Sequence, residues 1–137
     1  MLVGKSNNII GGQDVMSAEA KKILVVDDVA DDRLVAKIIL ERAGYVVVEA
    51  KDWKEALAII KKGDLALVLL DLRMPEMDGL ELLGKIRKEN SKESLPVLIY
   101  SSAPNTGDDY KFYGSNGYVK KYCDPKALVS KVKDVLK

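Results

Sequence analysis

Short apolar runs alternate with segments of helical periodicity along the chain from Lys21 onward. The runs are rich in β-branched residues and lie between charged or glycine-containing turns, which is typical of buried strands. They predict five strands, at residues 23–26, 45–49, 65–70, 97–100 and 117–119. The third run, LALVLL, has no polar residue, as expected of a central parallel strand covered on both faces.

The segments between these runs predict helices, because their apolar residues recur every three or four positions. Helices are predicted at residues 31–43, 52–62, 79–90 and from Pro125 onward. In the first helix, the apolar face is expected to comprise Leu34, Val35, Ile38 and Ile39. Residues 104–113 contain Pro, Asn, Gly and adjacent acids, so a fourth helix there is expected to be short or irregular.

Alternating strands and helices with short connections predict an α/β fold, a doubly wound five-stranded parallel sheet with helices on both faces. The 137 residues suffice for one domain with its own core. We expect residues 21–137 to form this domain and residues 1–20 to be a flexible leader. Ligands of such sheets bind beyond the carboxyl ends of the strands, so candidate chemistry is expected there.

The composition excludes several classes of protein. The chain has no histidine, which excludes Ser-His-Asp hydrolases, Cys-His proteases, most catalytic zinc sites and a self-contained phosphohistidine donor. The net charge of +1 gives no argument for direct binding to nucleic acid or to an anionic membrane. A single Cys, short apolar runs and no export signal predict a cytoplasmic protein without a membrane partner.

Polar side chains follow four of the five predicted strands. Asp27 and Asp28 follow the first strand and Asp71 the third, whereas Ser101 and Lys121 follow the fourth and fifth. Two carboxylates about 4 Å apart repel by roughly 4 kcal/mol at an effective dielectric constant near 20, which favours a bound cation. Mg²⁺ suits oxygen ligands and keeps waters for an incoming phosphate. A carboxylate nucleophile, a metal, a hydroxyl and an ammonium are the groups that an aspartyl phosphate requires.

Each of these residues alone has an ordinary structural explanation. Acids after a strand often cap the next helix, a serine pair often forms a turn, and a lysine is often solvated. The placement of all of them at the ends of different strands is harder to explain structurally and favours a phosphoryl site.

Four segments carry a resemblance to a known family: ILVVDD at 23–28, LLDLRMPEMDGLELL at 69–83, PVLIYSSA at 96–103 and GYVKK at 117–121. They resemble the receiver domain of two-component response regulators, including stand-alone receivers such as the chemotaxis regulator. The resemblance implies a flavodoxin-like (βα)5 fold. It also implies a phosphoacceptor signalling domain rather than an enzyme, because receivers catalyse only their own phosphorylation and dephosphorylation.

The resemblance assigns a metal site and a phosphoacceptor. Asp71 takes the place of the phosphoacceptor, and Asp27 and Asp28 take the place of the acidic pair that binds Mg²⁺ with it. Asp28 is expected to be the more direct ligand of that pair. The backbone carbonyl of Arg73 is expected to complete the protein ligands of the metal.

The resemblance also assigns the residues that respond to the phosphoryl group. Ser101 takes the place of the switch hydroxyl, Lys121 that of the phosphate-pairing lysine, and Tyr118 that of the aromatic switch, which turns inward on activation. The donor is expected to be a phosphohistidine on a histidine kinase or phosphotransfer protein, in keeping with the absence of histidine here. The signal is expected to reach an unknown protein target through the fourth helix, the fifth strand and the last helix.

Tyr122 departs from the family pattern, which nearly always has Pro after the lysine. A non-proline cis bond costs about 2.5–4 kcal/mol, so the bond before Tyr122 is expected to be trans.

Aromatic residues gather around the predicted fourth helix and suit a partner surface. They are Tyr110, Phe112, Tyr113, Tyr118 and Tyr122.

Two other functions require residues that this chain lacks. A haloacid dehalogenase phosphatase needs a second acid two residues after its nucleophile, where this chain has Arg73 after Asp71. A flavin carrier of the flavodoxin type needs a Ser/Thr/Gly phosphate loop where this chain has DDVADD. Two alternatives stay open: a receiver-fold adaptor that acts without phosphorylation, and a receiver fragment of a larger regulator.

Overall fold

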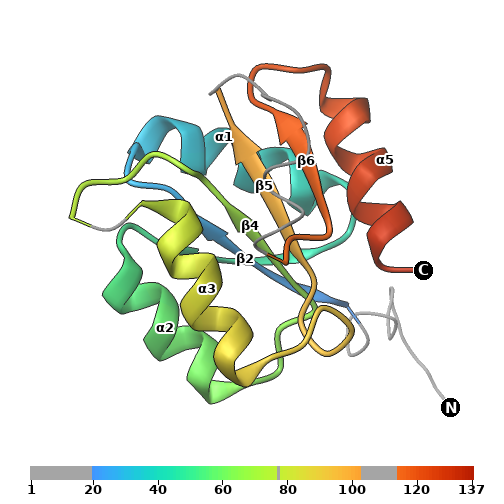
Figure 1. The fold of residues 1–137 in the computed structure, drawn as a ribbon. Coiled ribbons are helices and arrows are strands. Elements are labelled where there is room, and N and C mark those ends of the chain that lie inside the picture. The colour runs from blue at the N-terminus through green and yellow to red at the C-terminus, as the bar shows by residue number, and fades with distance from the viewer. Residues whose placement is uncertain (1–19, 77, 103–113) are drawn as a thin grey trace, which may run out of the picture.

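The computed structural model describes residues 20–76, 78–102 and 114–137 (Figure 1). The expected leader up to residue 19 and the expected fourth helix at 104–113, with Tyr110, Phe112 and Tyr113, lie outside the described residues. Within the described ranges, every helix is too short or too polar to traverse a lipid bilayer.

Five parallel strands form one sheet, in the order β3-β2-β4-β5-β6. The strands are β2 (Lys22–Val26), β3 (Val46–Ala50), β4 (Leu67–Leu70), β5 (Val97–Ser101) and β6 (Gly117–Lys120). The strands predicted from the sequence agree with these bounds to within two residues at each end. The register pairs Val26 with Leu70 and Leu70 with Ile99, so the carboxyl ends of β2, β4 and β5 meet at one edge.

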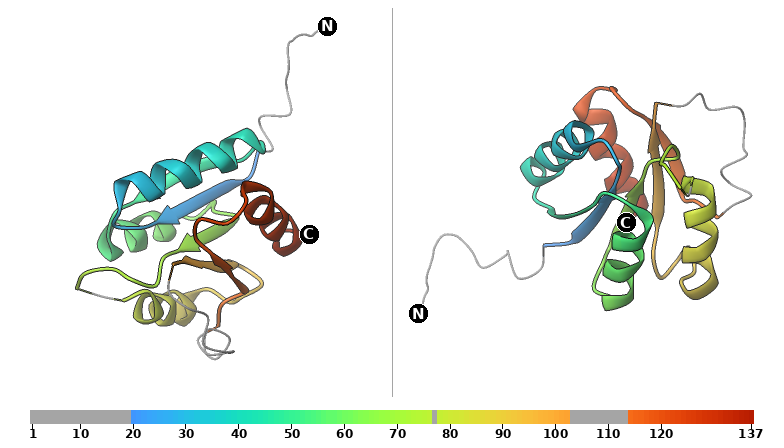
Figure 2. Two further views of the ribbon diagram at one scale, coloured as in Figure 1. Left: turned by 90° about the horizontal axis from the view of Figure 1, so that it is seen from above. Right: turned by 90° about the vertical axis from the view of Figure 1, so that its left-hand side faces the viewer.

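Helices cover both faces of the sheet, which confirms the predicted doubly wound architecture (Figures 1 and 2). The helices are α1 (Ala30–Arg42), α2 (Trp53–Lys62), α3 (Gly79–Glu89) and α5 (Pro125–Val135). Alternate residues of each strand face opposite layers, as strand geometry requires. Leu24 packs with α2 and α3, whereas Ile23 packs with α1 and α5.

The face of α1 that meets the sheet differs from the prediction. Ala36 and Leu40 are the buried residues of α1, whereas Leu34, Val35 and Ile38 are 53%, 51% and 41% exposed. The prediction of a core face containing these three residues was therefore wrong. The small side chain of Ala36 and the side chain of Leu40 pack in the core, and the three larger apolar residues lie on the solvent side of α1.

Side-chain caps fix the start of three helices. Asp52, Asp78 and Asp124 each accept a hydrogen bond from a backbone amide in the first turn of α2, α3 or α5. The N-cap residue of α1 is Val29, and its side chain makes no capping hydrogen bond. The acids next to α1 therefore do not occupy its N-cap position.

Arg87, near the end of α3, joins several segments at the amino-terminal edge of the sheet. Its Nε donates to the carbonyl of Gly114 at 2.7 Å, and its Nη1 donates to the carbonyls of Leu95 at 2.8 Å and Asn90 at 3.1 Å. Its Nη2 donates to Oδ1 of Asn116 at 3.0 Å. One guanidinium thus ties α3 to the starts of β5 and β6 through uncharged acceptors.

Among the described residues, strand β3 is one of the two edge strands of the sheet. Its Glu49 carboxylate lies 3.1 Å from Nε of Arg33 and 3.7 Å from Nζ of Lys37, both on α1. These contacts join the exposed edge to the helix that covers it.

Candidate functional site

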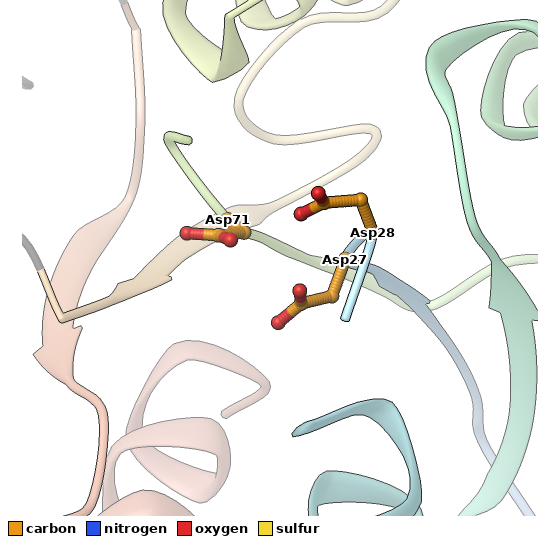
Figure 3. Close-up of side chains that lie close together, drawn as sticks. All are labelled: Asp27, Asp28 and Asp71. Carbon is orange, nitrogen blue, oxygen red and sulfur yellow. The ribbon is translucent and has the colours of Figure 1, made fainter. Parts of the chain in front are cut away.

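Three carboxylates meet where β2 and β4 end (Figure 3). Asp27 and Asp28 follow β2, and Asp71 follows β4, its neighbour in the sheet. The Asp71 amide donates to the carbonyl of Val26 at 3.0 Å, which extends the strand pairing by one residue. One oxygen of each carboxylate lies within 4.8 Å of the others; Asp27 and Asp71 are buried and Asp28 is exposed. The structure thus brings together the three acids that the sequence selected.

Gly79 fixes the backbone beyond Asp71. Its amide donates to the carbonyl of Leu72 at 2.8 Å, so the start of α3 lies directly against the end of β4. A Cβ atom at position 79 would lie 2.3 Å from the Asp71 carbonyl oxygen and 2.6 Å from the Leu72 Cα. Only glycine fits there without a backbone shift.

The backbone of Arg73 lies beside the Asp71 side chain. The Arg73 amide is 3.3 Å from Oδ1 of Asp71 and donates to it. This contact orients the carboxylate and brings the stretch that carries the Arg73 carbonyl close to the acids.

Lys121 brings a positive charge into the same pocket from the end of β6. Its amide donates to the carbonyl of Ser101 at 2.9 Å, which fixes the backbone at this point. Its Nζ lies 2.5 Å from Asp27, 2.9 Å from Asp32 and 3.3 Å from Asp71, and its side chain is 4% exposed. A single ammonium therefore contacts three carboxylates from three different elements.

Burial and hydrogen bonding shift the pKa values of this cluster. Burial raises the pKa of Asp27, although the hydrogen bonds from Lys121 and Val29 act in the opposite direction. Burial acts to lower the pKa of Lys121, but the hydrogen bonds to Asp27 and Asp32, together with the charges of Asp71 and Asp27, outweigh it and raise that pKa. The surroundings of Lys121 thus favour its protonated form, whereas burial of Asp27 disfavours its ionised form.

The donor set fits a hard divalent cation. Asp27, Asp28 and Asp71 offer carboxylate oxygens, the ligands that Mg²⁺ prefers. Asp32 adds a fourth carboxylate to the pocket, and three of the four contact the ammonium of Lys121, so the pocket carries excess negative charge when all four are ionised. The residues present therefore match the cation that the sequence predicts.

Ser101 and Tyr118 lie next to this pocket on the two following strands. Ser101 ends β5 and is fully buried, and Tyr118 in β6 is partly buried against the core. The Tyr118 hydroxyl donates to the carbonyl of Ser101 at 3.4 Å, and burial raises the pKa of this tyrosine. The two residues assigned to the switch are thus in contact.

Asp32, in the first turn of α1, was not among the site residues that the sequence predicted. The Asp32 side chain is 15% exposed and contacts Lys121, and the Tyr122 hydroxyl lies 3.3 Å from its Oδ2. The run of acids DDVADD was visible in the sequence, but the helical pattern alone did not show which acid turns toward the strands. No cis peptide bond occurs among the described residues, which confirms the trans bond expected before Tyr122.

The chain matches the family described as response regulator receiver domain over residues 23–133. It is 34% identical over 121 residues to a probable transcriptional regulator ycf27 of Porphyridium aerugineum, covering 87% of this chain but only 49% of that protein. It is 35% identical over 119 residues to a chemotaxis protein CheY homolog of Campylobacter jejuni, covering 84% of this chain and 92% of that protein.

Solved structures show the same architecture. The response regulator protein TrrA of Thermotoga maritima, solved in complex with Mg²⁺ and BeF, is 34% identical and superposes with a TM-score of 0.77. The match covers 85% of this chain and 99% of that one. The similarity therefore includes both sequence and fold along nearly all of the described residues.

Proposed function

Because this chain belongs to the family of response regulator receiver domains, we propose that it accepts a phosphoryl group on Asp71 from a phosphohistidine of another protein. The observation that carries this proposal is the buried Asp71 carboxylate, which lies within reach of Lys121 and beside two further acids. We assign this role to residues 21–137, whether they act alone, as in chemotaxis-type receivers, or within a longer regulator.

The chemical step is a transfer between two nucleophiles. An oxygen of the Asp71 carboxylate attacks phosphorus, and the bond between phosphorus and the donor imidazole nitrogen breaks. The electron pair of that bond returns to the imidazole, and the product on this chain is an aspartyl phosphate. Lys121 pairs with a phosphoryl oxygen, and the Ser101 hydroxyl donates to another, which holds the transferred group.

Asp27, Asp28, Asp71 and the Arg73 carbonyl would hold Mg²⁺. The metal, when bound, neutralises charge on the phosphoryl oxygens. The Arg73 amide keeps one Asp71 oxygen oriented, which leaves the other oxygen for attack. Burial of Asp71 excludes water from the nucleophile.

The response to phosphorylation would start at Ser101 and Tyr118. Movement of the Ser101 hydroxyl toward the phosphoryl group disturbs the backbone whose carbonyl Tyr118 contacts. A change in the Tyr118 position shifts the population between two states of the surface around β5, β6 and α5. That surface would bind a downstream protein, and a histidine kinase or phosphotransfer protein would supply the phosphoryl group in the cytoplasm.

Intact-mass measurement after incubation with phosphoramidate and Mg²⁺ tests the proposal. The wild-type chain should gain one phosphoryl group that hydroxylamine removes, and Asp71→Asn should gain none. Asp31→Asn is the matched control, because Asp31 is exposed and makes no hydrogen bond or ion pair with the described residues. It should gain the group as the wild type does.

The competing function is an adaptor that acts without phosphorylation. A chain that gains no mass with phosphoramidate or with a phosphorylated histidine protein, although it binds Mg²⁺, would contradict the proposal and support the adaptor. A phosphoryl group that persists in Asp71→Asn would instead place the acceptor elsewhere.

A further inference from the structure

Asp32 contacts the Lys121 ammonium but is not one of the three acids that would hold Mg²⁺. Its Oδ2 lies 2.9 Å from Nζ of Lys121, and the same Nζ lies 2.5 Å from Oδ2 of Asp27 and 3.3 Å from Oδ2 of Asp71. Among the described residues, Lys121 is the cation that Asp32 pairs with. Asp32 therefore competes with Asp71 for the ammonium. When the ammonium moves away, Mg²⁺ does not replace it as the partner of Asp32, because Asp32 is not one of the acids that would hold the metal.

Tyr122 also contacts Asp32. Its hydroxyl lies 3.3 Å from Oδ2 and 3.5 Å from Oδ1 of Asp32. Tyr122 has a φ of 65° and its side chain is 77% exposed. A bulky residue is rare in this left-handed region, and so exposed a ring gains little from burial. The contact with Asp32 is the hydrogen bond that this side chain makes in the described structure.

We propose that Asp32, oriented by Tyr122, shares the Lys121 ammonium with Asp71 in the unmodified protein and so weakens the affinity of the pocket for a phosphoryl group. This inference rests on the proposed function, since it concerns the same pocket. Asp32 is a positioning residue here, because it acts on the phosphoryl group only through Lys121.

The physical basis is competition for one ammonium. A phosphoryl group on Asp71 adds negative charge and draws Lys121 toward it. As the ammonium turns, Asp32 loses its cation while it stays largely buried, which leaves a carboxylate with only a phenol for a partner. Mg²⁺ offsets the charge of the other acids but is not held by Asp32. The cost of that loss opposes occupation of the pocket.

Binding of beryllofluoride, a tetrahedral analogue of a phosphoryl group, tests this inference in the full chain. Beryllofluoride is titrated in the presence of saturating Mg²⁺, and the bound form is measured by ¹⁹F NMR. Asp32→Asn keeps the shape of the side chain and should raise the affinity about tenfold relative to wild type. Asp31→Asn removes the same charge from the adjacent position without touching Lys121 and should stay within about twofold of wild type. Tyr122→Phe should fall between them.

A second measurement separates this inference from the proposed function. The ammonium of Lys121 should give a slowly exchanging ¹⁵N–¹H signal in wild type and Asp31→Asn, and exchange should be faster in Asp32→Asn. If wild type binds no beryllofluoride, the proposed function fails, and the ammonium signal alone decides whether Asp32 holds Lys121. Equal or weaker beryllofluoride binding by Asp32→Asn than by Asp31→Asn overturns the inference, as does an unchanged ammonium signal.

Discussion

The carboxyl edge of the sheet, where the strands end, and the amino edge, where they begin, each contain a cation that contacts several acceptors. The acceptors differ between the two edges. At the carboxyl edge, Lys121 lies among three carboxylates, from Asp27, Asp32 and Asp71. At the amino edge, Arg87 donates to backbone carbonyls and to an amide oxygen. The pKa values shift in opposite directions as a result. The pKa of Lys121 is raised, whereas burial lowers the pKa of Arg87 despite the nearby charge of Glu93.

The difference shows which cation another ion can replace. The Asp27 and Asp71 carboxylates can pair with a divalent metal as well as with an ammonium, so these two contacts of Lys121 are exchangeable, whereas Asp32 is not one of the acids that would hold the metal. A guanidinium that contacts several carbonyls donates through a planar, rigid set of N–H groups, and neither a metal nor an ammonium reproduces that geometry. We therefore assign chemistry to the Lys121 edge and structural connection to the Arg87 edge.

The largest effect is expected for Lys121→Met without metal. Removing the ammonium leaves Asp27 and Asp71 buried without a cation, and the free energy of unfolding should fall by about 4 kcal/mol. Mg²⁺ should recover much of this loss, because the more negative pocket binds the metal more tightly. Urea unfolding with and without Mg²⁺ measures both effects. A loss that Mg²⁺ does not reduce would contradict the view that this cation is replaceable.

Arg87→Met should lower the free energy of unfolding by about 3 kcal/mol, because several partly buried carbonyls lose their donor. Mg²⁺ should not reduce the difference from wild type. Arg87→Lys is the matched variant; it keeps the charge but should recover less than half of the loss, since an ammonium lacks the fork. Full recovery by lysine would show that charge alone matters at this edge.

Gly79→Ala should destabilise the carboxyl edge by about 2 kcal/mol, because its Cβ would meet backbone atoms of Asp71 and Leu72. Gly84→Ala in the same helix is the control, since a Cβ there meets nothing within 4 Å. That variant should gain up to about 1 kcal/mol from helix propensity. Urea unfolding of both variants measures the contrast, and equal losses would contradict the close contact at position 79.

The smallest effect concerns pH. Burial raises the pKa of Tyr100, in β5, to about 12, with smaller contributions from the charges around it. The unfolded chain ionises this tyrosine near pH 10, so its contribution is fully present below pH 10 and falls as pH rises toward 12. By pH 11 the loss should reach about 1.4 kcal/mol. Tyr100→Phe should lack this part of the pH dependence, as measured by urea unfolding at pH 9 and pH 11. An equal fall in the free energy of unfolding between the two pH values in wild type and Tyr100→Phe would contradict this prediction.

Much of the fold followed from the sequence, because buried strands and helix caps leave a local pattern. The acids at the ends of β2 and β4 were also predictable, since parallel strands end at a common edge. The contacting face of α1 was not predictable, because Ala36 packs closely while larger residues stay exposed. Asp32 was missed for the same reason, since its role depends on how α1 is rotated against the sheet.

The connections of Arg87 could not be predicted at all. Its partners are chiefly backbone carbonyls, which every residue carries, so no residue type marks them. Tyr122 was recognised as a departure from the family pattern, but its contact with Asp32 joins positions 90 residues apart. Such long-range pairs need the three-dimensional arrangement.

The position of β3 at the edge of the sheet, within the part of the chain that the structure describes, has a consequence for the behaviour of the protein at high concentration. An exposed edge strand presents unpaired backbone groups to which a strand of another molecule can add, the first step of aggregation. The run Tyr45–Val48 is apolar, and Val46 is 43% exposed. Glu49 places a charge on this strand, and Arg33 and Lys37 of α1 lie beside it. A strand added at this edge would have to desolvate these charges. We expect this cluster to disfavour extension of the sheet by a neighbouring molecule.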